Sequence, residues 1–197
     1  MRALLATLLI CCATLAAAND LPAHFHVKGV ASDDVLNVRA EPDASATILG
    51  DYGPYTINIE VLELSTDGKW GKVGLGETNG WVAMRFLERS DHTQPNEIPR
   101  PISCFGTEPF WTFNLTARGD EFSSIDMPRI DLEPTDMLTT SNGFFIEFRE
   151  TERLIVRRGQ CSDGMSDRTF GWRSTALYMG LNGPEIAEGC CTLDAAK

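Results

Sequence analysis

The stretch Leu36-Asn37-Val38-Arg39-Ala40-Glu41-Pro42 decides the fold of the first half, together with two later motifs, Lys69-Trp70-Gly71-Lys72-Val73 and Gly80-Trp81-Val82. Residues 35–39 alternate apolar and polar side chains, which is the period of a half-buried strand. Asp67-Gly68 is a hairpin-turn signal shortly before the first tryptophan. We therefore expect about five short strands in residues 19–90, closed into a small barrel that protects its edges.

In order and spacing these motifs resemble the bacterial SH3-like domain, a small β-barrel with which exported bacterial proteins bind peptides or cell-wall material. The resemblance covers roughly residues 24–89 and implies a non-catalytic binding module. Three shorter segments also match: Ile48-Leu49-Gly50, Val61-Leu62 and Phe86-Leu87. Between Gly50 and Val61 the chain is a residue longer than the pattern and carries Asp51, Tyr52 and Tyr55 in place of the common lysines, so the ligand is not carried over.

The aromatic residues of this half have a functional and a structural interpretation. An aromatic-lined groove of the kind that SH3 domains use for extended ligands would have Tyr52, Tyr55 and Trp70 as its walls. Alternatively, Trp70 and Trp81 fill the barrel. We assign Asn37, Arg39 and Trp81 to the structural motif, and expect Arg39 to fix the following loop through a charge-assisted hydrogen bond. Within 56–64 we expect a strand with Ile57, Ile59 and Val61 facing inward.

The N-terminus has the pattern of a secretory signal peptide. Met1-Arg2 is a short positive region, residues 3–18 are apolar apart from two threonines, and Ala16-Ala17-Ala18 is an A-x-A cleavage pattern. We predict a signal peptide at 1–18, cleavage after Ala18, and a periplasmic or secreted protein with no membrane span, because the apolar run is shorter than a spanning helix. A lipoprotein anchored at Cys11 or Cys12 is the alternative, although neither follows the small residue that lipidation requires.

Charge narrows the range of partners. The chain has 17 basic and 28 acidic residues and a net charge of −11, and only one basic residue leaves with the signal peptide. Both halves are acidic, so neither has the basic stripe that nucleic acids or anionic membranes select. We expect no nucleic-acid partner.

After signal cleavage the four remaining cysteines all lie in the second half, and in an exported protein an even number indicates disulfides. If Cys190 and Cys191 lie in a strand, their side chains point to opposite faces. We therefore favour Cys104 and Cys161 each bonding one of the adjacent pair, without choosing which. The paired C-x₂-C spacing of a structural zinc site is absent, and we expect no metal and no cofactor.

Proline-rich residues 88–103 mark the domain boundary, with a linker at 91–101 and a second domain at 102–197. The second half also has strand patterns: Trp111, Phe113 and Leu115 share one face, and Phe144, Ile146 and Phe148 share another. No convincing helix of ten residues follows the signal. The sequence therefore predicts an all-β protein, a small SH3-like barrel plus a second disulfide-stabilised antiparallel β domain.

Three segments of the second half resemble an uncharacterised domain of exported bacterial proteins. They are Cys104-Phe105-Gly106-Thr107-Glu108-Pro109-Phe110-Trp111, residues 161–167 and Gly189-Cys190-Cys191. The resemblance spans about residues 102–192 and implies export and a cysteine-stabilised β fold, but no reaction. We assign Glu108 and Trp111 to this structural motif.

Catalytic chemistry has little support in the sequence. The histidines are His24, His26 and His92, near the new N-terminus and in the linker, so a nucleophile–histidine pair within a folded core is hard to build. A hydrolase using Glu108 with Asp163 or Asp167 as a carboxylate pair is the enzymatic alternative. The calcium-loop spacing is missing around Asp163 and Asp167.

The function predicted from sequence is thus an exported, non-catalytic binding protein of the cell envelope. Its SH3-like domain would bind a peptide or a peptidoglycan element. The other open alternatives are the envelope hydrolase and an inhibitor or assembly partner of another envelope protein.

Overall fold

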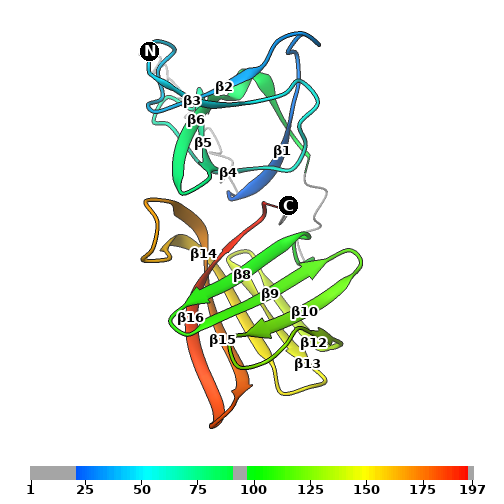
Figure 1. Cartoon of the computed structure of the whole chain (residues 1–197). Helices are drawn as coiled ribbons and strands as arrows, with labels where there is room; N and C mark the ends of the chain where they lie inside the picture. Colours follow the sequence, from blue (N-terminus) through cyan, green and yellow to red (C-terminus); the bar gives the residue numbers. More distant parts are fainter. Residues whose placement is uncertain (1–20, 91–96, 195–197) are drawn as a thin grey trace, which may run out of the picture.

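A computed structural model describes residues 21–90 and 97–194 and shows a protein built almost entirely of β-strands (Figure 1). The strands form two antiparallel sheets, of seven and nine strands. The all-β fold class predicted from sequence is confirmed. The predicted signal peptide (1–18) and most of the predicted linker (91–101) lie outside the described residues.

The first sheet, residues 21–90, wraps around its own core and is called the barrel below. Its strand order is β3-β2-β6-β5-β4-β1-β7, and its valines at 38, 61, 73 and 82 are fully buried. The strands are β1 (Ala23–Val27), β2 (Leu36–Arg39), β3 (Ile48–Tyr52), β4 (Ile59–Leu64), β5 (Trp70–Leu75), β6 (Thr78–Ala83) and β7 (Leu87–Arg89), with a 3-10 turn η1 (Met84–Phe86) before the last.

The barrel has seven strands where the sequence predicts about five, and the start of one strand also differs from the prediction. The sequence pattern places Ile57 on an inner face, but β4 begins only at Ile59 and Ile57 is 67% exposed. The reason is Asn58, whose φ of 58° puts the backbone in the left-handed region and interrupts the extended chain.

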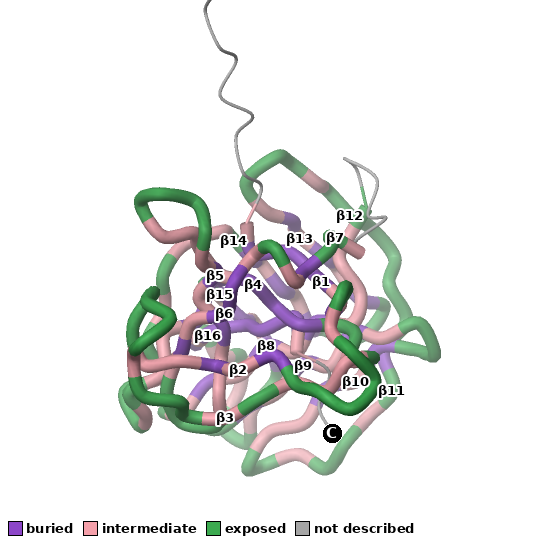
Figure 2. Tube along the Cα trace, turned by 90° about the horizontal axis from the view of Figure 1, so that it is seen from above, coloured by how far each residue is buried: buried purple, intermediate pink, exposed green. Residues whose placement is uncertain are grey.

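The second sheet, residues 102–192, has the order β11-β10-β9-β8-β16-β15-β14-β13-β12. Its two outermost strands, β11 and β12, are consecutive in the chain with one residue between them, so the sheet curls back on itself. Figure 2 shows the buried chain gathered at the centre of the molecule and exposed residues in the peripheral loops. The strands are β8 (Ile102–Thr107), β9 (Phe110–Thr116), β10 (Gly119–Ser124), β11 (Ile130–Leu132), β12 (Pro134–Thr140), β13 (Gly143–Phe148), β14 (Arg153–Ser162), β15 (Thr169–Gly180) and β16 (Gly183–Thr192).

The core of the second domain follows the predicted alternation. Trp111, Phe113 and Leu115 point inward from β9, and the predicted apolar face of β13 points inward opposite them. The rings of Phe113 and Phe122 pack with centroids 4.6 Å apart. Aromatic residues bury large apolar areas, so these rings dominate the stability of this core.

Both disulfides use the adjacent cysteines of β16 as predicted. Cys191 lies directly opposite Cys104 on β8 and bonds it, while Cys190 bonds Cys161 at the end of β14. Two disulfides are typical of proteins from an oxidising, extracellular-type compartment.

The two domains make direct contacts, and the chain after β16 passes between them (Figure 1). The Asn79 side chain donates a hydrogen bond to the Thr169 carbonyl (3.1 Å) and accepts one from the Thr169 amide (2.6 Å). Arg158 donates to the Pro22 carbonyl at 3.0 Å. Gly171 lies so close to Pro22 that a Cβ there would be 2.0 Å from the proline ring.

The end of the predicted linker is bound to the second domain. Ile98 packs against the second core, and Arg100 pairs with the buried carboxylate of Asp120. Arg100 also donates to the Thr116 carbonyl at 2.9 Å. Residues 97–101 therefore help to fix where the chain enters the second domain.

Asn79→Ala is expected to lower the free energy of unfolding by about 1–3 kcal/mol, because it leaves the Thr169 amide and carbonyl without their partner. Urea denaturation of the full chain measures the change. Thr78→Ala, at the exposed neighbouring position, is the matched control and should have little effect. Equal effects of the two substitutions would contradict the importance of this bridge.

Candidate functional site

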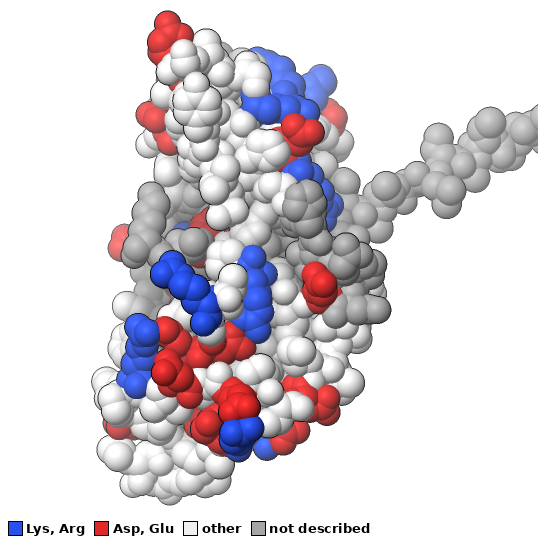
Figure 3. All heavy atoms as spheres, turned by 90° about the vertical axis from the view of Figure 1, so that its right-hand side faces the viewer, with Lys and Arg blue, Asp and Glu red and all other residues white. Residues whose placement is uncertain are grey.

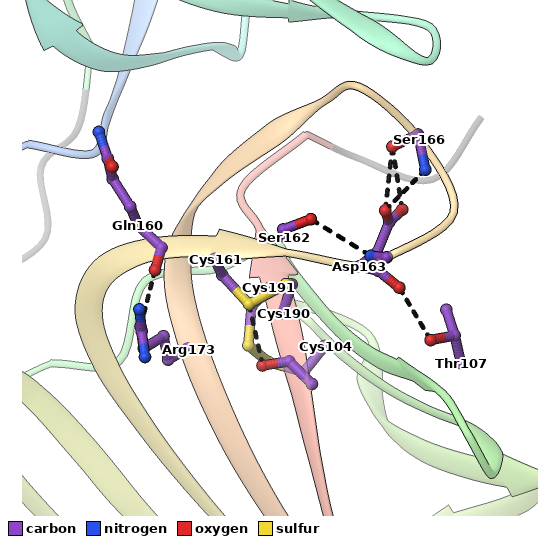
Figure 4. The surroundings of a disulfide bond; sticks show 12 residues. Cys104, Thr107, Gln160, Cys161, Ser162, Asp163, Ser166, Arg173, Cys190 and Cys191 are labelled. Atoms are coloured by element: carbon purple, nitrogen blue, oxygen red, sulfur yellow. Dashed lines mark hydrogen bonds between the residues drawn. A yellow bond between two sulfur atoms is a disulfide. The ribbon is translucent and has the colours of Figure 1, made fainter.

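The best candidate site is a groove on the outer face of the second sheet, the face opposite its core, beside the Cys161–Cys190 disulfide (Figure 4). Two hollows of about 330 Å³ each share Asp163 and residues 105–107 in their walls. The disulfide hollow is also lined by Cys161, Ser162, Arg173, Glu188, Gly189 and Cys190. The aromatic hollow is also lined by Phe110, Trp111, Thr112, Ser123, Ser124 and Ile125.

The loop that links β14 to β15, residues 163–168, is fixed beside both hollows and is called the strap. The Thr107 hydroxyl donates to the Asp163 carbonyl at 2.9 Å, which joins the strap to β8 (Figure 4). The Asp163 carboxylate accepts hydrogen bonds from the Met165 and Ser166 amides, both at 3.0 Å. Partial burial tends to raise the pKa of Asp163, but these hydrogen bonds outweigh burial and lower the pKa overall.

The floor of the groove explains two glycines of the motif. A Cβ at Gly106 would lie 2.2 Å from Nε1 of the Trp111 indole, and a Cβ at Gly189 would lie 2.6 Å from the same ring and 2.1 Å from the Phe105 carbonyl oxygen. The indole therefore lies across both glycines. Trp111 is 1% exposed, so the motif builds a packed floor under the groove.

The rim of the aromatic hollow is apolar and open to solvent. Phe110 is 51% exposed and Ile125 is 71% exposed, and the Ile125 amide donates to the Phe110 carbonyl at 3.0 Å, which holds the two residues side by side. The hydroxyl residues Thr107, Thr112 and Ser123 line the same hollow. An apolar rim with hydroxyl groups suits a ligand that has both apolar and hydrogen-bonding parts.

The disulfide hollow adds charges of both signs. Arg173 donates from Nε to the Gln160 carbonyl at 2.7 Å, and Glu188 accepts from the Thr175 hydroxyl at 3.0 Å. Both charged residues are exposed on neighbouring strands. Figure 3 likewise shows acidic and basic side chains interspersed over the second domain on the face in view, without a continuous basic surface.

The three predicted ligand-binding residues of the barrel come from β3, the loop between β3 and β4, and β5. The Tyr52 hydroxyl donates to the Gly74 carbonyl at 3.3 Å, and Gly74 lies four residues beyond Trp70 on β5, roughly 13 Å along the strand. Burial, together with the Asp194 carboxylate, raises the pKa of Tyr52 to about 12, so its hydroxyl stays neutral. Tyr55 is 80% exposed in the loop between β3 and β4. These three residues line neither the disulfide hollow nor the aromatic hollow.

The residues assigned to the barrel's structural motif lie on its central strands. Arg39 donates to the Ala46 carbonyl at 2.7 Å across the loop that follows β2. Asn37 is half-buried opposite Asp51, and Trp81 lies opposite both Arg39 and Lys72. The Lys72 ammonium is 6.0 Å from the centre of the Trp81 ring.

The carboxylates of the hydrolase hypothesis lie on two segments, the turn between β8 and β9 and the strap. Glu108 is exposed in the turn between β8 and β9, and Asp167 is exposed on the strap. The Asp163 carboxylate is engaged by strap amides, and its pKa is lowered instead of raised as a general acid requires. Among the described residues, no group of three or more metal-ligating side chains comes together.

Three acids outside the groove are buried, Glu60, Asp120 and Glu152, and sequence reasoning singled out none of them. Glu60 of β4 is 1% exposed and faces the second domain, where Thr192 donates to it at 2.5 Å. The alternation of β4 predicts that Glu60 lies on the polar face of the strand. Glu60 is buried because the second domain contacts that face, and a local sequence pattern does not show such a contact. Of the histidines, His24 is buried at the same contact, His26 lies 3.6 Å from Glu88, and His92 is outside the described residues.

No protein-family model, curated protein or solved structure matches the chain. Within residues 21–90 and 97–194, no helix is long and apolar enough to cross a membrane.

Gly189→Ala is expected to destabilise the protein by about 3 kcal/mol, because the new methyl group would collide with the Phe105 carbonyl and the Trp111 ring. Thermal or urea unfolding measures the loss. Gly53→Ala, where the nearest atom is 3.8 Å away, should change the stability by less than about 0.5 kcal/mol. A Gly189→Ala protein as stable as the wild type would contradict the packed floor.

The two disulfides should differ in their reaction with reductant. Cys104 and Cys191 are fully buried, whereas Cys161 is half-buried and lines a hollow. Thiolate attack requires access to a sulfur, so limited reduction followed by alkylation should label Cys161 and Cys190 first. Mass spectrometry of the alkylated peptides shows the order in which the cysteines are labelled. Simultaneous labelling of all four cysteines would contradict it.

Proposed function

We propose that this protein is an exported, non-catalytic binding protein of the bacterial cell envelope, whose ligand is a peptidoglycan element or an extended peptide. The disulfides support an oxidising compartment. The N-terminal pattern supports secretion to the periplasm or beyond, and the SH3-like resemblance supports a binding role.

The observation that carries the proposal is the pair of hollows that share Asp163 and residues 105–107. Each hollow, at about 330 Å³, is at the small end of the range for ligand pockets. Together they suit an elongated ligand with one part in each hollow. Because the disulfide and the Thr107–Asp163 hydrogen bond fix the strap, such a ligand meets a preformed surface and binding loses little entropy.

The chemistry of the two hollows fits a glycan joined to a short peptide. The aromatic hollow offers Phe110 together with hydroxyl groups, which suit the apolar faces and hydroxyl groups of a sugar. The disulfide hollow offers Arg173 and Glu188, which suit the carboxylate and amine groups of a stem peptide. Peptidoglycan contains both parts.

The barrel keeps a second candidate surface. Tyr55 and Ile57 are both strongly exposed in the loop between β3 and β4, where the chain departs from the SH3-like pattern. The first half resembles a binding module, and a ligand bound at this loop would fit that resemblance. The test therefore includes a variant of this loop.

Sedimentation of residues 19–197 with purified cell wall tests the proposal. Phe110→Ala is expected to weaken binding about tenfold, since truncating an aromatic residue that anchors a ligand costs about 1 kcal/mol or more. Tyr55→Ala removes the exposed aromatic side chain of the second candidate surface and should bind as the wild type does if the ligand occupies the groove.

Three results would overturn parts of the proposal. No enrichment of the wild type over an unrelated acidic protein would refute wall binding and favour a protein partner, sought by co-purification from the envelope. Loss of binding in Tyr55→Ala alone would move the site to the barrel. Wild-type binding by both variants would refute the groove.

A further inference from the structure

The chain that follows β16 connects the two domains through buried polar groups. The Thr192 hydroxyl donates to Oε2 of Glu60 on β4 at 2.5 Å. His24 on β1 donates from Nε2 to the carbonyl of Leu193 at 2.6 Å, and Leu193 is itself buried. A carboxyl group, an imidazole and a hydroxyl group are thus enclosed where the barrel meets the second domain.

Glu60 is poorly suited to carry a charge in this place. Its second oxygen, Oε1, is buried and has no hydrogen-bond partner of normal geometry among the described residues. An ionised carboxylate removed from water needs compensating partners, and without them the neutral acid is favoured.

The charged and titratable groups around Glu60 come from several elements. Asp194, after β16, repels a carboxylate, whereas Arg168 of the strap attracts it. Arg168 is bound to Asp194 at 2.5 Å, so much of its charge is already compensated. His24 lies directly opposite Glu60 on β1, and Tyr52, from β3, faces the same Asp194 and Arg168 and stays neutral.

The combined effect of burial and of the neighbouring groups favours the protonated form of Glu60. Burial first, and then Asp194, raise the pKa of Glu60 to about 7, against the opposing effects of Thr192, the Leu193 amide and Arg168. If the domains separate, the carboxyl group meets water and its pKa returns towards the ordinary value of 4.5.

We propose that docking of the barrel onto the second domain is linked to one proton on Glu60. The docked arrangement of the two domains is more stable while the carboxyl group is neutral, and the domains separate more readily when it ionises. The fold thus contains a proton-sensitive contact, separate from the groove and independent of the proposed ligand.

The direction of the pH effect follows from linkage. Between pH 4.5 and about 7 the docked form retains the proton and the open form releases it. Each pH unit in this interval therefore raises the opening equilibrium constant by up to about tenfold. Below and above the interval both forms have the same protonation state at Glu60, and this dependence disappears.

Hydrogen exchange at the Thr169 amide reports opening, because this amide donates across the domain contact to Asn79. Its protection factor removes the direct effect of pH on exchange chemistry. From pH 5 to pH 7 the wild-type protection factor is expected to fall about 40-fold, given a pKa of 4.5 in the open form and about 7 in the docked form. Glu60→Gln, permanently neutral, should stay within about threefold.

Two variants separate this proposal from other titrations. Glu41→Gln removes an exposed carboxylate of the same barrel and should follow the wild type. His24 and its hydrogen bond to Leu193 are retained in Glu60→Gln, so a pH dependence that persists in that variant does not arise from Glu60. A flat wild-type profile, or an equal slope in Glu60→Gln, would overturn the proposal.

Another variant, Thr192→Val, tests the proposal if Glu60→Gln fails to fold. Thr192→Val removes the hydroxyl donor that favours the ionised carboxylate, with little change of shape. The upper limit of the pH interval over which protection falls should then move upward, because the pKa of Glu60 rises in the docked form and is unchanged in the open form. An interval identical to that of the wild type would overturn the link between Glu60 and docking.

Discussion

Cys190 and Cys191 are neighbours on β16, so their side chains leave the strand on opposite faces, and the candidate site depends on this geometry. Cys191 bonds Cys104 within the core, while Cys190 holds Cys161 on the outer face. The bonds span sequence separations of 87 and 29 residues, and each is expected to contribute about 2–4 kcal/mol. One bond fixes β8 beside β16, and the other fixes the start of the strap over the outer face.

The strap and the groove follow from these two constraints. With β8 in place, Gly106 and Gly189 receive the Trp111 indole, and Thr107 reaches the Asp163 carbonyl. The motif residues of the second half therefore build a rigid scaffold, and the more exposed residues around it, such as Phe110 and Ile125, are left free to contact a ligand. The domain contact adds a separate constraint, because Glu60 and Asn79 of the barrel bond Thr192 and Thr169 of the second domain.

Features determined by local pattern were predictable from the sequence. The alternation in β9 and β13 identifies their buried faces, and the opposite directions of adjacent side chains in a strand identify the use of both neighbouring cysteines. Features determined by long-range contact were not predictable. Ile59-Glu60-Val61 has the pattern of a strand with a polar outer face, yet Glu60 is buried because the second domain covers it. The hydrogen bond from the Tyr52 hydroxyl to the Gly74 carbonyl on β5 likewise depends on how the strands are arranged in space.

The central claim is that the strap and β8 form a ligand-binding groove. The most direct measurement is a two-dimensional NMR titration of labelled residues 19–197 with soluble peptidoglycan fragments. The account predicts that the shifted amides cluster in residues 105–112, 123–125 and 161–166, around the two hollows. Shifts confined to the barrel loop at residues 53–58, or no shifts at saturating fragment, would contradict it.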